Sequence, residues 1–423
     1  MMNVAILGVG TVGSEVANIL IENKKLISAR SGVKIVPLIG VVRNLNKQRN
    51  CKIPLSDDLN SVIDRNDIDV FVELMGGVEQ PYRIINRILK KQKAVVTANK
   101  ALLAYHRYSL QSLAGNTPFG FEASVAGGIP IIKALREGLS ANKILKITGI
   151  MNGTSNYILT NMAQNGENFD IVLKKAQDLG YAEADPAFDI GGFDAAHKLL
   201  ILASIAYGVH GNPEDILIEG IENITQEDIY FAKEFEFVIK LLTIAKRIDD
   251  ENVELRVHPA LVPQDKMLAN VGGVMNAVSV YGDCVGETLF YGPGAGGKAT
   301  ASAVISDLID IARGTKSPML GYKMQNEIHQ MKLLPACEIM TKYYLRLKVE
   351  DKKGVLAKIT NIMSENNISI DSFLQKPKAK EESDVTLFFT THTSFEKDIQ
   401  NVIEILNTQS YLKQKVAMIR IEE

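Results

Sequence analysis

A glycine-rich turn near the start of the chain constrains the fold more than any other feature. Residues 4–7 form a short apolar run typical of a buried parallel strand, and Gly8-Val9-Gly10-Thr11-Val12-Gly13 follows directly, ahead of apolar residues at helical spacing. In this context the first glycine permits a tight turn, the second lets a pyrophosphate approach the backbone, and the third lets the helix pack closely on the strand. The phosphates would meet free N–H groups at the helix N-terminus. The sequence therefore predicts dinucleotide binding at Gly8, Gly10, Thr11, Val12 and Gly13.

The segments that follow continue an alternation of strand and helix. Apolar runs at 34–42, 69–74 and 94–97 are predicted strands, and 81–91 is a predicted helix between two of them. This order is typical of a parallel sheet with crossover helices, the arrangement of a Rossmann-type α/β unit. We therefore assign residues 1–130 to a dinucleotide-binding domain.

The length of 423 residues suggests about three domains, at roughly 150 residues each. After residue 130 the pattern changes to glycine-rich segments between longer elements, with predicted helices at 194–209 and across most of 225–247. We assign 131–297 to an α+β substrate-binding, catalytic and dimerisation domain. We expect 298–325, which includes a helix at 299–313, to pack back on the first domain, and 326–340 to be a linker.

The last part of the chain, 341–423, reads as a separate unit. Strands are predicted at 343–349, 368–374, 384–391 and 416–421, with a Lys/Glu-rich turn between the second and third. Helices are predicted at 355–366 and from a cap at Ser394 to residue 407. The resulting order, βαββαβ, is that of a ferredoxin-like domain.

Charge, hydropathy and cysteine content exclude several functional classes. Lys and Arg number 47 against 49 Asp and Glu, so the chain lacks the strong positive charge of a nucleic-acid binder. The longest apolar stretch, 199–209, is shorter than the ~18 residues of a membrane helix, and no secretory signal is recognisable. Three cysteines without CxxC spacing favour neither disulfides nor a zinc site. A cytoplasmic protein without nucleic-acid or membrane partners is expected.

The end of the second predicted strand bears on the choice of cofactor. The chain there reads Val42-Arg43-Asn44, without the acidic residue that usually binds a ribose hydroxyl. An arginine at this place can accommodate a 2′-phosphate, which favours NADP, although NAD remains possible. The alternative is that Arg43 is an ordinary solvated side chain.

A charged pair at the start of the 194–209 helix is the strongest candidate for catalysis. Asp194 and Lys198 are four residues apart, hence on one face, and that face continues with apolar residues. The acidic segment 180–189 lies just upstream, and a buried charged pair beside further carboxylates is costly unless it serves a purpose. Such carboxylates can hold an ammonium group, and the lysine can move a proton. The alternatives are a solvent-exposed ion pair and, for His197 on another side of the helix, a structural role.

Glu122 precedes the glycine-rich stretch Ala-Ser-Val-Ala-Gly-Gly-Ile-Pro. One carboxylate and several main-chain carbonyls can form an all-oxygen cation site. A plain strand-to-helix turn is the alternative interpretation.

Six segments taken together resemble one enzyme family. VAILGVGTVG (4–13), TANKALLA (97–104), FEASVAGGIPII (121–132), GIMNGTSNYIL (149–159), GYAEADPAFDIGGFDAAHKL (180–199) and GPGAGGKATASAV (292–304) are similar, in this order, to segments of homoserine dehydrogenase, over about residues 3–325. The tail resembles an ACT regulatory domain, with 351–356 matching its ligand loop. Lys353 stands where the family often has proline.

The resemblance implies reversible, NAD(P)-dependent interconversion of L-homoserine and L-aspartate 4-semialdehyde, a step toward threonine and methionine. It implies that Lys198 transfers the proton at the substrate oxygen and that Lys100 is a second active-site lysine that touches the cofactor. The remaining implied residues are Glu183, Asp194 and Asp189 for substrate, Thr97, Gly180 and Gly296 for cofactor, and Glu122 with the carbonyls of Val125, Gly127 and Ile129 for Na⁺.

Other readings stay open at this point. A dinucleotide- and amino-acid-sensing regulator without turnover would keep the same fold, although Lys198, Asp194, Glu183 and Lys100 are all present. Phosphorylating aldehyde oxidation would need a nucleophilic cysteine, and none of the three lies in a suitable motif. The resemblance further implies a homodimer or homotetramer, with threonine as the expected effector of the ACT domain.

Overall fold

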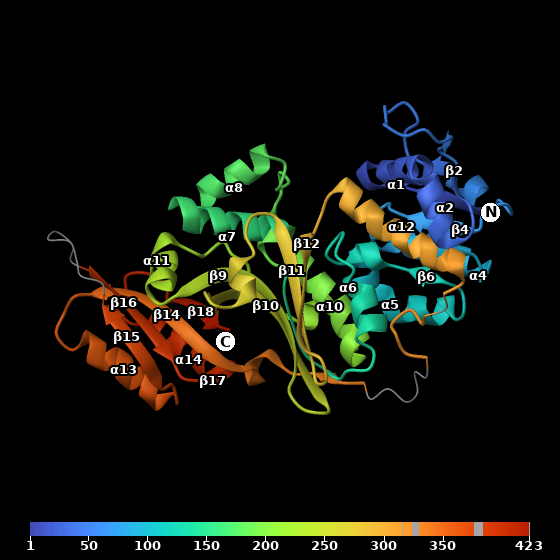
Figure 1. The fold of residues 1–423 in the computed structure, drawn as a ribbon. Coiled ribbons are helices and arrows are strands. Elements are labelled where there is room, and N and C mark those ends of the chain that lie inside the picture. The colour runs from blue at the N-terminus through green and yellow to red at the C-terminus, as the bar shows by residue number, and fades with distance from the viewer. Residues whose placement is uncertain (316, 324–329, 376–383, 423) are drawn as a thin grey trace.

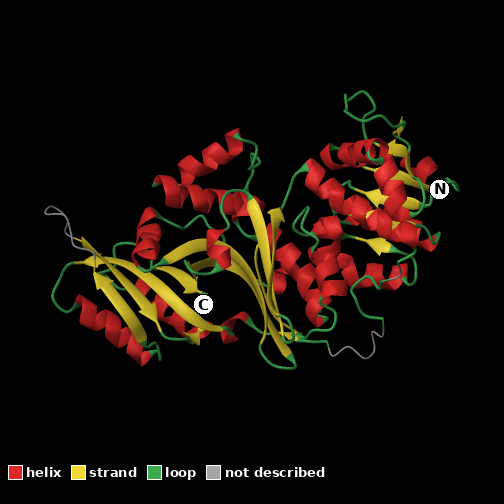
Figure 2. Cartoon of the chain, viewed as in Figure 1, coloured by secondary structure: helices red, strands yellow, loops and turns green. Residues whose placement is uncertain are grey.

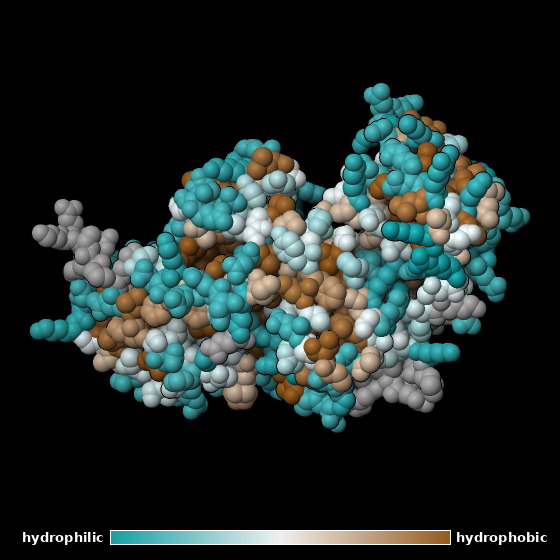
Figure 3. Space-filling view, viewed as in Figure 1, coloured by the Kyte–Doolittle hydropathy of each residue, from teal (hydrophilic) through white to brown (hydrophobic). Residues whose placement is uncertain are grey.

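The computed structural model describes residues 1–315, 317–323, 330–375 and 384–422. Three parts follow one another along an elongated molecule, from the N-terminal unit at the right of Figure 1 to the C-terminal unit at the left. The surface is notched between the lobe that carries helices α7 and α8 and the N-terminal lobe, whose visible face is largely hydrophilic (Figure 3).

The N-terminal unit contains a six-stranded parallel sheet in the order β3-β2-β1-β4-β5-β6. The order reverses between β1 and β4, and such a switch point is where open α/β sheets bind ligands. The elements are β1 (Met2–Leu7), α1 (Thr11–Glu22), α2 (Lys24–Ser31), β2 (Ile35–Val41), β3 (Leu55–Ser56), α3 (Leu59–Ile63), β4 (Val70–Glu73), α4 (Glu79–Lys90), β5 (Ala94–Thr97), α5 (Lys100–Ala114) and β6 (Phe119–Gly120). The expected Rossmann-type fold is confirmed.

The middle of the chain adds an antiparallel sheet and the most buried helix, α10. The strands of this sheet lie in the order β12-β11-β7-β9-β10. The elements are η1 (Glu122–Ser124), α6 (Ile131–Lys133), the π-helical turn η2 (Ala134–Gly138), β7 (Ile144–Ile150), α7 (Gly153–Asn165), α8 (Phe169–Asp178), α9 (Ala187–Ile190), α10 (Phe193–Tyr207), η3 (Pro213–Asp215), β8 (Leu217–Ile218), α11 (Gln226–Glu234), β9 (Phe237–Arg247), β10 (Asn252–Pro263), η4 (Met267–Asn270), β11 (Met275–Gly282), β12 (Gly286–Pro293) and α12 (Gly297–Arg313).

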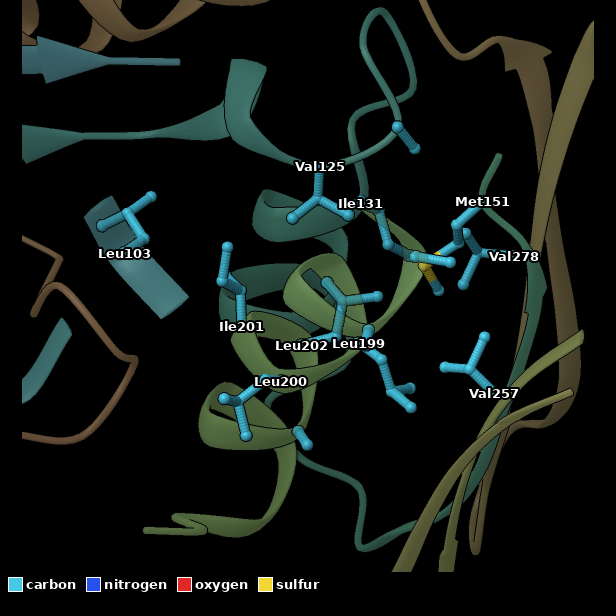
Figure 4. Close-up of a cluster of buried hydrophobic side chains, with 14 of the residues drawn as sticks. Leu103, Val125, Ile131, Met151, Leu199, Leu200, Ile201, Leu202, Val257 and Val278 are labelled. Atoms are coloured by element: carbon cyan, nitrogen blue, oxygen red, sulfur yellow. The ribbon is translucent and has the colours of Figure 1, made fainter. Parts of the chain in front are cut away.

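Helix α10 lies between this sheet and the N-terminal unit. Figure 4 shows its leucine and isoleucine side chains between Val257 and Val278 of the sheet and Leu103 of α5. All residues from Asp194 to Ile205 are buried, so the helix is enclosed around its whole circumference, and its buried side chains are mostly apolar. Helix α12 packs its Ala301 and Val304 into the same apolar cluster as Val4 of β1.

The predicted helix over 225–247 is wrong in its second half. Helix α11 ends at Glu234, Glu236 takes a left-handed φ of 58°, and strand β9 follows. This strand is flanked by β7 and β10 and is buried on both faces, so its sequence is almost continuously apolar and carries no alternation. Apolar periodicity alone does not separate such a strand from a buried helix.

The C-terminal unit has the predicted βαββαβ order, and its helices lie together on one face of its sheet (Figure 2). Its sheet is not separate, however: strand β18 pairs in parallel with β10, which joins both sheets into one of twelve strands. The elements are β13 (Lys332–Leu333), η6 (Ala336–Glu338), β14 (Met340–Glu350), α13 (Val355–Glu365), β15 (Ile370–Gln375), β16 (Asp384–Thr391), β17 (Ser394–Phe395), α14 (Glu396–Asn407) and β18 (Ala417–Ile421).

Two further expectations for this part of the chain need correction or fall outside the described residues. Ser394 does not cap α14, because it pairs with Thr341 in β17, its hydroxyl donates to the His392 carbonyl, and the first helical N–H, of Glu396, donates to the Ile339 carbonyl. The Lys/Glu-rich turn at 376–383 and linker residues 326–329 lie outside the described residues. Among the helices the structure describes, none is long and apolar enough to cross a membrane.

Candidate functional site

The glycine-rich turn forms one wall of a cavity of about 850 Å³ at the carboxyl edge of the N-terminal sheet. Gly8 has φ of 102°, and a Cβ there would lie 2.5 Å from the Leu74 carbonyl oxygen, so only glycine fits. A Cβ at Gly13 would lie 2.3 Å from the Gly8 carbonyl oxygen, which explains the close packing of α1 on β1. At Gly10 the Cβ position is open, as the approach of a pyrophosphate requires.

The start of a second helix converges on the same place. A Cβ at Gly297, the first residue of α12, would lie 3.1 Å from both Thr11 and Glu15 of α1. Neither α1 nor α12 has a side-chain cap, so both helices begin with N–H groups that no cap satisfies. Two adjacent helix N-termini favour a bound anion, and the cradle therefore fits a dinucleotide. Gly296, with φ of 112°, is the N-cap of α12.

Three basic residues line the cavity where β2 ends. Arg43 lies there, as expected, and is exposed. Lys47, also exposed, and the half-buried Arg49 join it and were not predicted from the sequence. Arg49 donates to the carbonyls of Val9, Asn44 and Lys47 at 2.8–3.0 Å and so orders the loop. The signal that could have identified Lys47 and Arg49 was their position close behind Arg43, after a strand that ends without an acidic residue.

Asp194 is the centre of the catalytic candidate. It is 2% exposed, and its Oδ2 lies 2.7 Å from Lys198 Nζ, while its Oδ1 lies 2.5 Å from Lys100 Nζ. Lys198 also donates to the Met151 carbonyl at 2.7 Å. The two lysines come from different units, Lys198 from α10 and Lys100 from the first residue of α5, so the carboxylate joins the two sides of the site.

The charges in this cluster hold one another ionised. Burial acts to raise the pKa of Asp194, but the ammonium groups of Lys198 and Lys100 outweigh it and hold that pKa well below its usual value. Burial likewise acts to lower the pKa of Lys100, and Asp194, Asp189 and Glu183 together outweigh it and raise that pKa. The site therefore presents fixed charges of both signs.

Asn152 links the carboxylates and was not anticipated from the sequence. Its Nδ2 donates to Asp189 Oδ1 at 2.8 Å and to Asp194 Oδ2 at 2.9 Å, and its Oδ1 caps helix α7 by accepting from Ser155 N. Both the amide NH₂ group and the amide oxygen of Asn152 are therefore engaged in hydrogen bonds. Its place in the GIMNGTSN segment, between a strand and a helix, was the signal that could have identified it.

The remaining predicted substrate and cofactor residues lie at the rim. Glu183 is exposed, and its charge reaches Lys100. Burial, followed by the charge of Asp194, raises the pKa of the half-buried Asp189. Gly180 is exposed with φ of 75°. His197 is 6% exposed and packs edge-on against Tyr105 and Phe188, an environment in which burial lowers its pKa.

Thr97 uses its hydroxyl inside the protein rather than toward the cavity. The hydroxyl donates to Glu73 Oε2 at 2.6 Å and accepts from the Asn99 N–H at 3.0 Å. Glu73 is fully buried, and burial raises its pKa against the opposing hydrogen bonds from Thr97 and Met75. Any contact of Thr97 with a cofactor would therefore involve its backbone.

The predicted cation segment forms a tight, buried turn. Glu122 accepts from the Ile132 and Lys133 N–H groups at 2.8 and 2.9 Å, and burial together with Asp307 raises its pKa to about 7. Ala126 and Gly127 both have φ near 55°, which turns successive carbonyls in different directions. The Ile129 carbonyl already accepts from Ile131 N. A buried carboxylate short of positive charge fits a bound cation.

Three family models match successive parts of the chain. The family model described as homoserine dehydrogenase, NAD binding domain, matches residues 8–118, the model homoserine dehydrogenase matches 130–309, and the ACT domain model matches 343–409. Homoserine dehydrogenase of Helicobacter pylori is 54% identical over 422 residues, covering 100% of this chain and 99% of that protein.

Solved structures agree. A homoserine dehydrogenase from Thiobacillus denitrificans superposes with a TM-score of 0.93 at 44% identity, covering 100% of this chain and 98% of that one. A hyperthermophilic archaeal homoserine dehydrogenase in complex with NADPH gives 0.62 at 27% identity, covering 73% of this chain and 97% of that one. The chain belongs to the homoserine dehydrogenase family, oxidoreductases that act on a CH–OH group.

Proposed function

We propose that this chain interconverts L-homoserine and L-aspartate 4-semialdehyde with Lys198 as the proton-transferring group. The observation that carries the proposal is the shared carboxylate Asp194, which holds Lys198 and Lys100 in one buried cluster. A bound nicotinamide supplies the hydride chemistry. In the reductive direction Lys198 gives its proton to the developing alkoxide, while Asp194 and the Met151 carbonyl aim its ammonium group.

The carboxylates of Glu183, Asp194 and Asp189 bind the substrate. They supply the negative charge that an amino-acid ammonium group requires, and they discriminate against simple alcohols, which leave those groups unpaired. NADP-dependent oxidation of homoserine at alkaline pH tests the proposal. A folded sample that binds NADP without turnover would instead support the sensing regulator.

Arg43 is proposed to select NADP by pairing with its 2′-phosphate. Losing one hydrogen-bonded charge pair costs about 1.5–3 kcal/mol, so Arg43→Ala should raise the KM for NADP about 10–100-fold and leave the KM for NAD within about twofold. Steady-state kinetics with both cofactors measures this. Arg65→Ala is the matched control, because Arg65 pairs with Asp67 just ahead of β4, at the opposite edge of the sheet. An equal loss for both cofactors would remove the role of Arg43.

A sodium ion is proposed at Glu122 with the carbonyls of Val125, Gly127 and Ile129. Its supporting observation is the buried Glu122 carboxylate, which lies close to a second buried carboxylate, Asp307. Replacing NaCl by choline chloride at constant ionic strength should lower the melting temperature by several degrees, because a ligand that binds only the folded state stabilises it. Glu122→Gln should abolish this difference. A sodium effect that persists in the variant would contradict the assignment.

A homodimer through the middle domain is proposed on the basis of exposed apolar side chains along and beside the β11–β12 strand pair, at one edge of its sheet. Four apolar side chains there are each 48–66% exposed: Tyr281 of β11, Val285 in the turn, Tyr291 of β12 and Met267 of η4. Apolar side chains gathered in this way mark interaction sites. Sedimentation velocity should give twice the chain mass, and a monomer would contradict the proposal.

Regulation and location complete the proposed function. We expect the ACT domain to take threonine as its effector, which kinetics with and without threonine will reveal as inhibition. All three cysteines, Cys51, Cys284 and Cys337, are unpaired, as suits a protein of the reducing cytoplasm.

A further inference from the structure

A fully buried glutamate lies at the point where the N-terminal sheet reverses its strand order. Glu73 is the last residue of β4, is 0% exposed, and directly precedes Leu74 and Met75, which line the cofactor cavity. No role in proton transfer or substrate binding has been assigned to it above. A buried carboxyl group is costly to keep, so its contacts indicate what it does.

The contacts of Glu73 join two loops on either side of the switch point. Oε1 accepts from Met75 N at 2.8 Å, in the loop after β4, and Oε2 accepts from the Thr97 hydroxyl at 2.6 Å, at the end of β5. The Thr97 hydroxyl donates to Glu73 Oε2 while its oxygen accepts from Asn99 N at 3.0 Å, so Glu73 and Asn99 are joined through Thr97. Each carboxyl oxygen thus makes one hydrogen bond, to a different loop.

The chain of hydrogen bonds continues to the catalytic cluster. Asn99 caps α5 by accepting from Leu102 N at 3.1 Å, and its Nδ2 donates to the Gly77 carbonyl at 2.8 Å, back in the loop after β4. The next residue, Lys100, is the first of α5 and reaches Asp194 at 2.5 Å. Hydrogen bonds therefore tie the start of α5 to the loop after β4, and Glu73 accepts one bond from that loop and one from the end of β5.

We propose that Glu73 is a positioning residue that fixes the start of α5 so that Lys100 meets Asp194. The inference rests on the proposed role of Lys100 in the active site. A glutamine at 73 keeps the shape but has one acceptor oxygen in place of two, so either the Met75 N–H or the hydroxyl hydrogen of Thr97 loses its acceptor. The two loops would then separate, and Lys100 would lose its geometry while Asp194 and Lys198 keep theirs.

A double-mutant cycle tests this directly. Glu73→Gln should lower kcat about 10–50-fold, Lys100→Met should lower it further, and Glu73→Gln added to Lys100→Met should change kcat by less than threefold, since residues that act through one group are not additive. Val70→Ala, which removes buried apolar atoms from the same strand, is the control for stability. It should change kcat by less than twofold in either background at a comparable drop in melting temperature.

The outcomes separate this inference from the function on which it rests. If Lys100→Met turns over normally, the proposed role of Lys100 fails. If Lys100→Met is impaired but Glu73→Gln lowers kcat equally in both backgrounds, or no more than Val70→Ala does, the positioning role of Glu73 is overturned. Should Glu73→Gln not fold, Thr97→Val replaces it in the cycle, because valine keeps the branched shape but removes the hydroxyl that donates to Glu73 Oε2.

Discussion

Lys198→Met is expected to lower kcat for homoserine oxidation by about 10²–10⁴-fold, the usual contribution of a general acid–base group. Lys198 is 8% exposed, and methionine retains its apolar stem but removes the ammonium group that donates to both Asp194 and the Met151 carbonyl. The dissociation constant for NADP, measured by fluorescence titration, should stay within about threefold, because the dinucleotide cradle is built from α1, α12 and the β2 loop.

Lys240→Met is the matched control for this substitution. Lys240 is a second buried lysine, 3% exposed, that donates to the Val271 carbonyl at 2.6 Å, and burial lowers its pKa to about 8. Its loss should cost stability but leave turnover of the folded enzyme near normal. Comparable kcat losses in both variants, or a near-normal kcat in Lys198→Met, would show that Lys198 does not transfer the proton.

Short sequence spacings predicted correctly where Asp194 and Lys198 lie. Four residues on a helix put Asp194 and Lys198 on one face, and the apolar residues that follow indicated that the face is buried, as the structure has it. The N-terminal glycines were equally informative, because a strand–turn–helix context restricts what Gly8 and Gly13 can do. In both cases the physics is local: a helical repeat or a single tight turn determines the geometry.

Long-range contacts could not be predicted in the same way. Lys100 and Asp194 form an ion pair between two units of the chain. Asn152 donates hydrogen bonds to residues 37 and 42 positions away, and Glu73 accepts one from a residue 24 positions away. Nothing in their immediate neighbours indicates these partners. Strand β9 shows the same limitation, since pairing with β7 and β10 selects its conformation. So does β18, whose pairing with β10 joins two units that the sequence presents as separate.

Asp194→Asn is expected to be the most damaging single change after Lys198→Met, because it affects both lysines at once. The variant leaves two ammonium groups together without their shared counter-charge, and breaking a buried ion pair costs about 3–5 kcal/mol. Substrate binding and proton transfer both suffer, so kcat/KM should fall by at least about 10³-fold, with KM raised as well as kcat lowered. Asp228→Asn is the control. Asp228 is a 1%-exposed carboxylate that binds Arg346 and Tyr344 outside the site, so its loss should reduce stability and spare turnover.

The pH dependence gives Asp194→Asn a second, independent readout. The folded-state pKa of Asp194 lies below its usual 3.8, so its stabilising effect is fully present above pH 3.8 and is lost only as the pH falls toward the folded-state value. The difference in unfolding free energy between wild type and variant, measured by urea titration, should therefore be constant from pH 5 to pH 8, where the Asp194 carboxylate stays ionised. Asp194 also raises the pKa of Lys100 against burial, and without it that pKa falls. The variant should accordingly recover part of its lost stability toward alkaline pH, because Lys100 then releases its proton more readily in the folded than in the unfolded state, and the difference from wild type should narrow there. A penalty that instead grows as the pH falls from 8 to 5 would mean that Asp194 takes up a proton in that range in the folded enzyme, and the shared-carboxylate site would have to be abandoned.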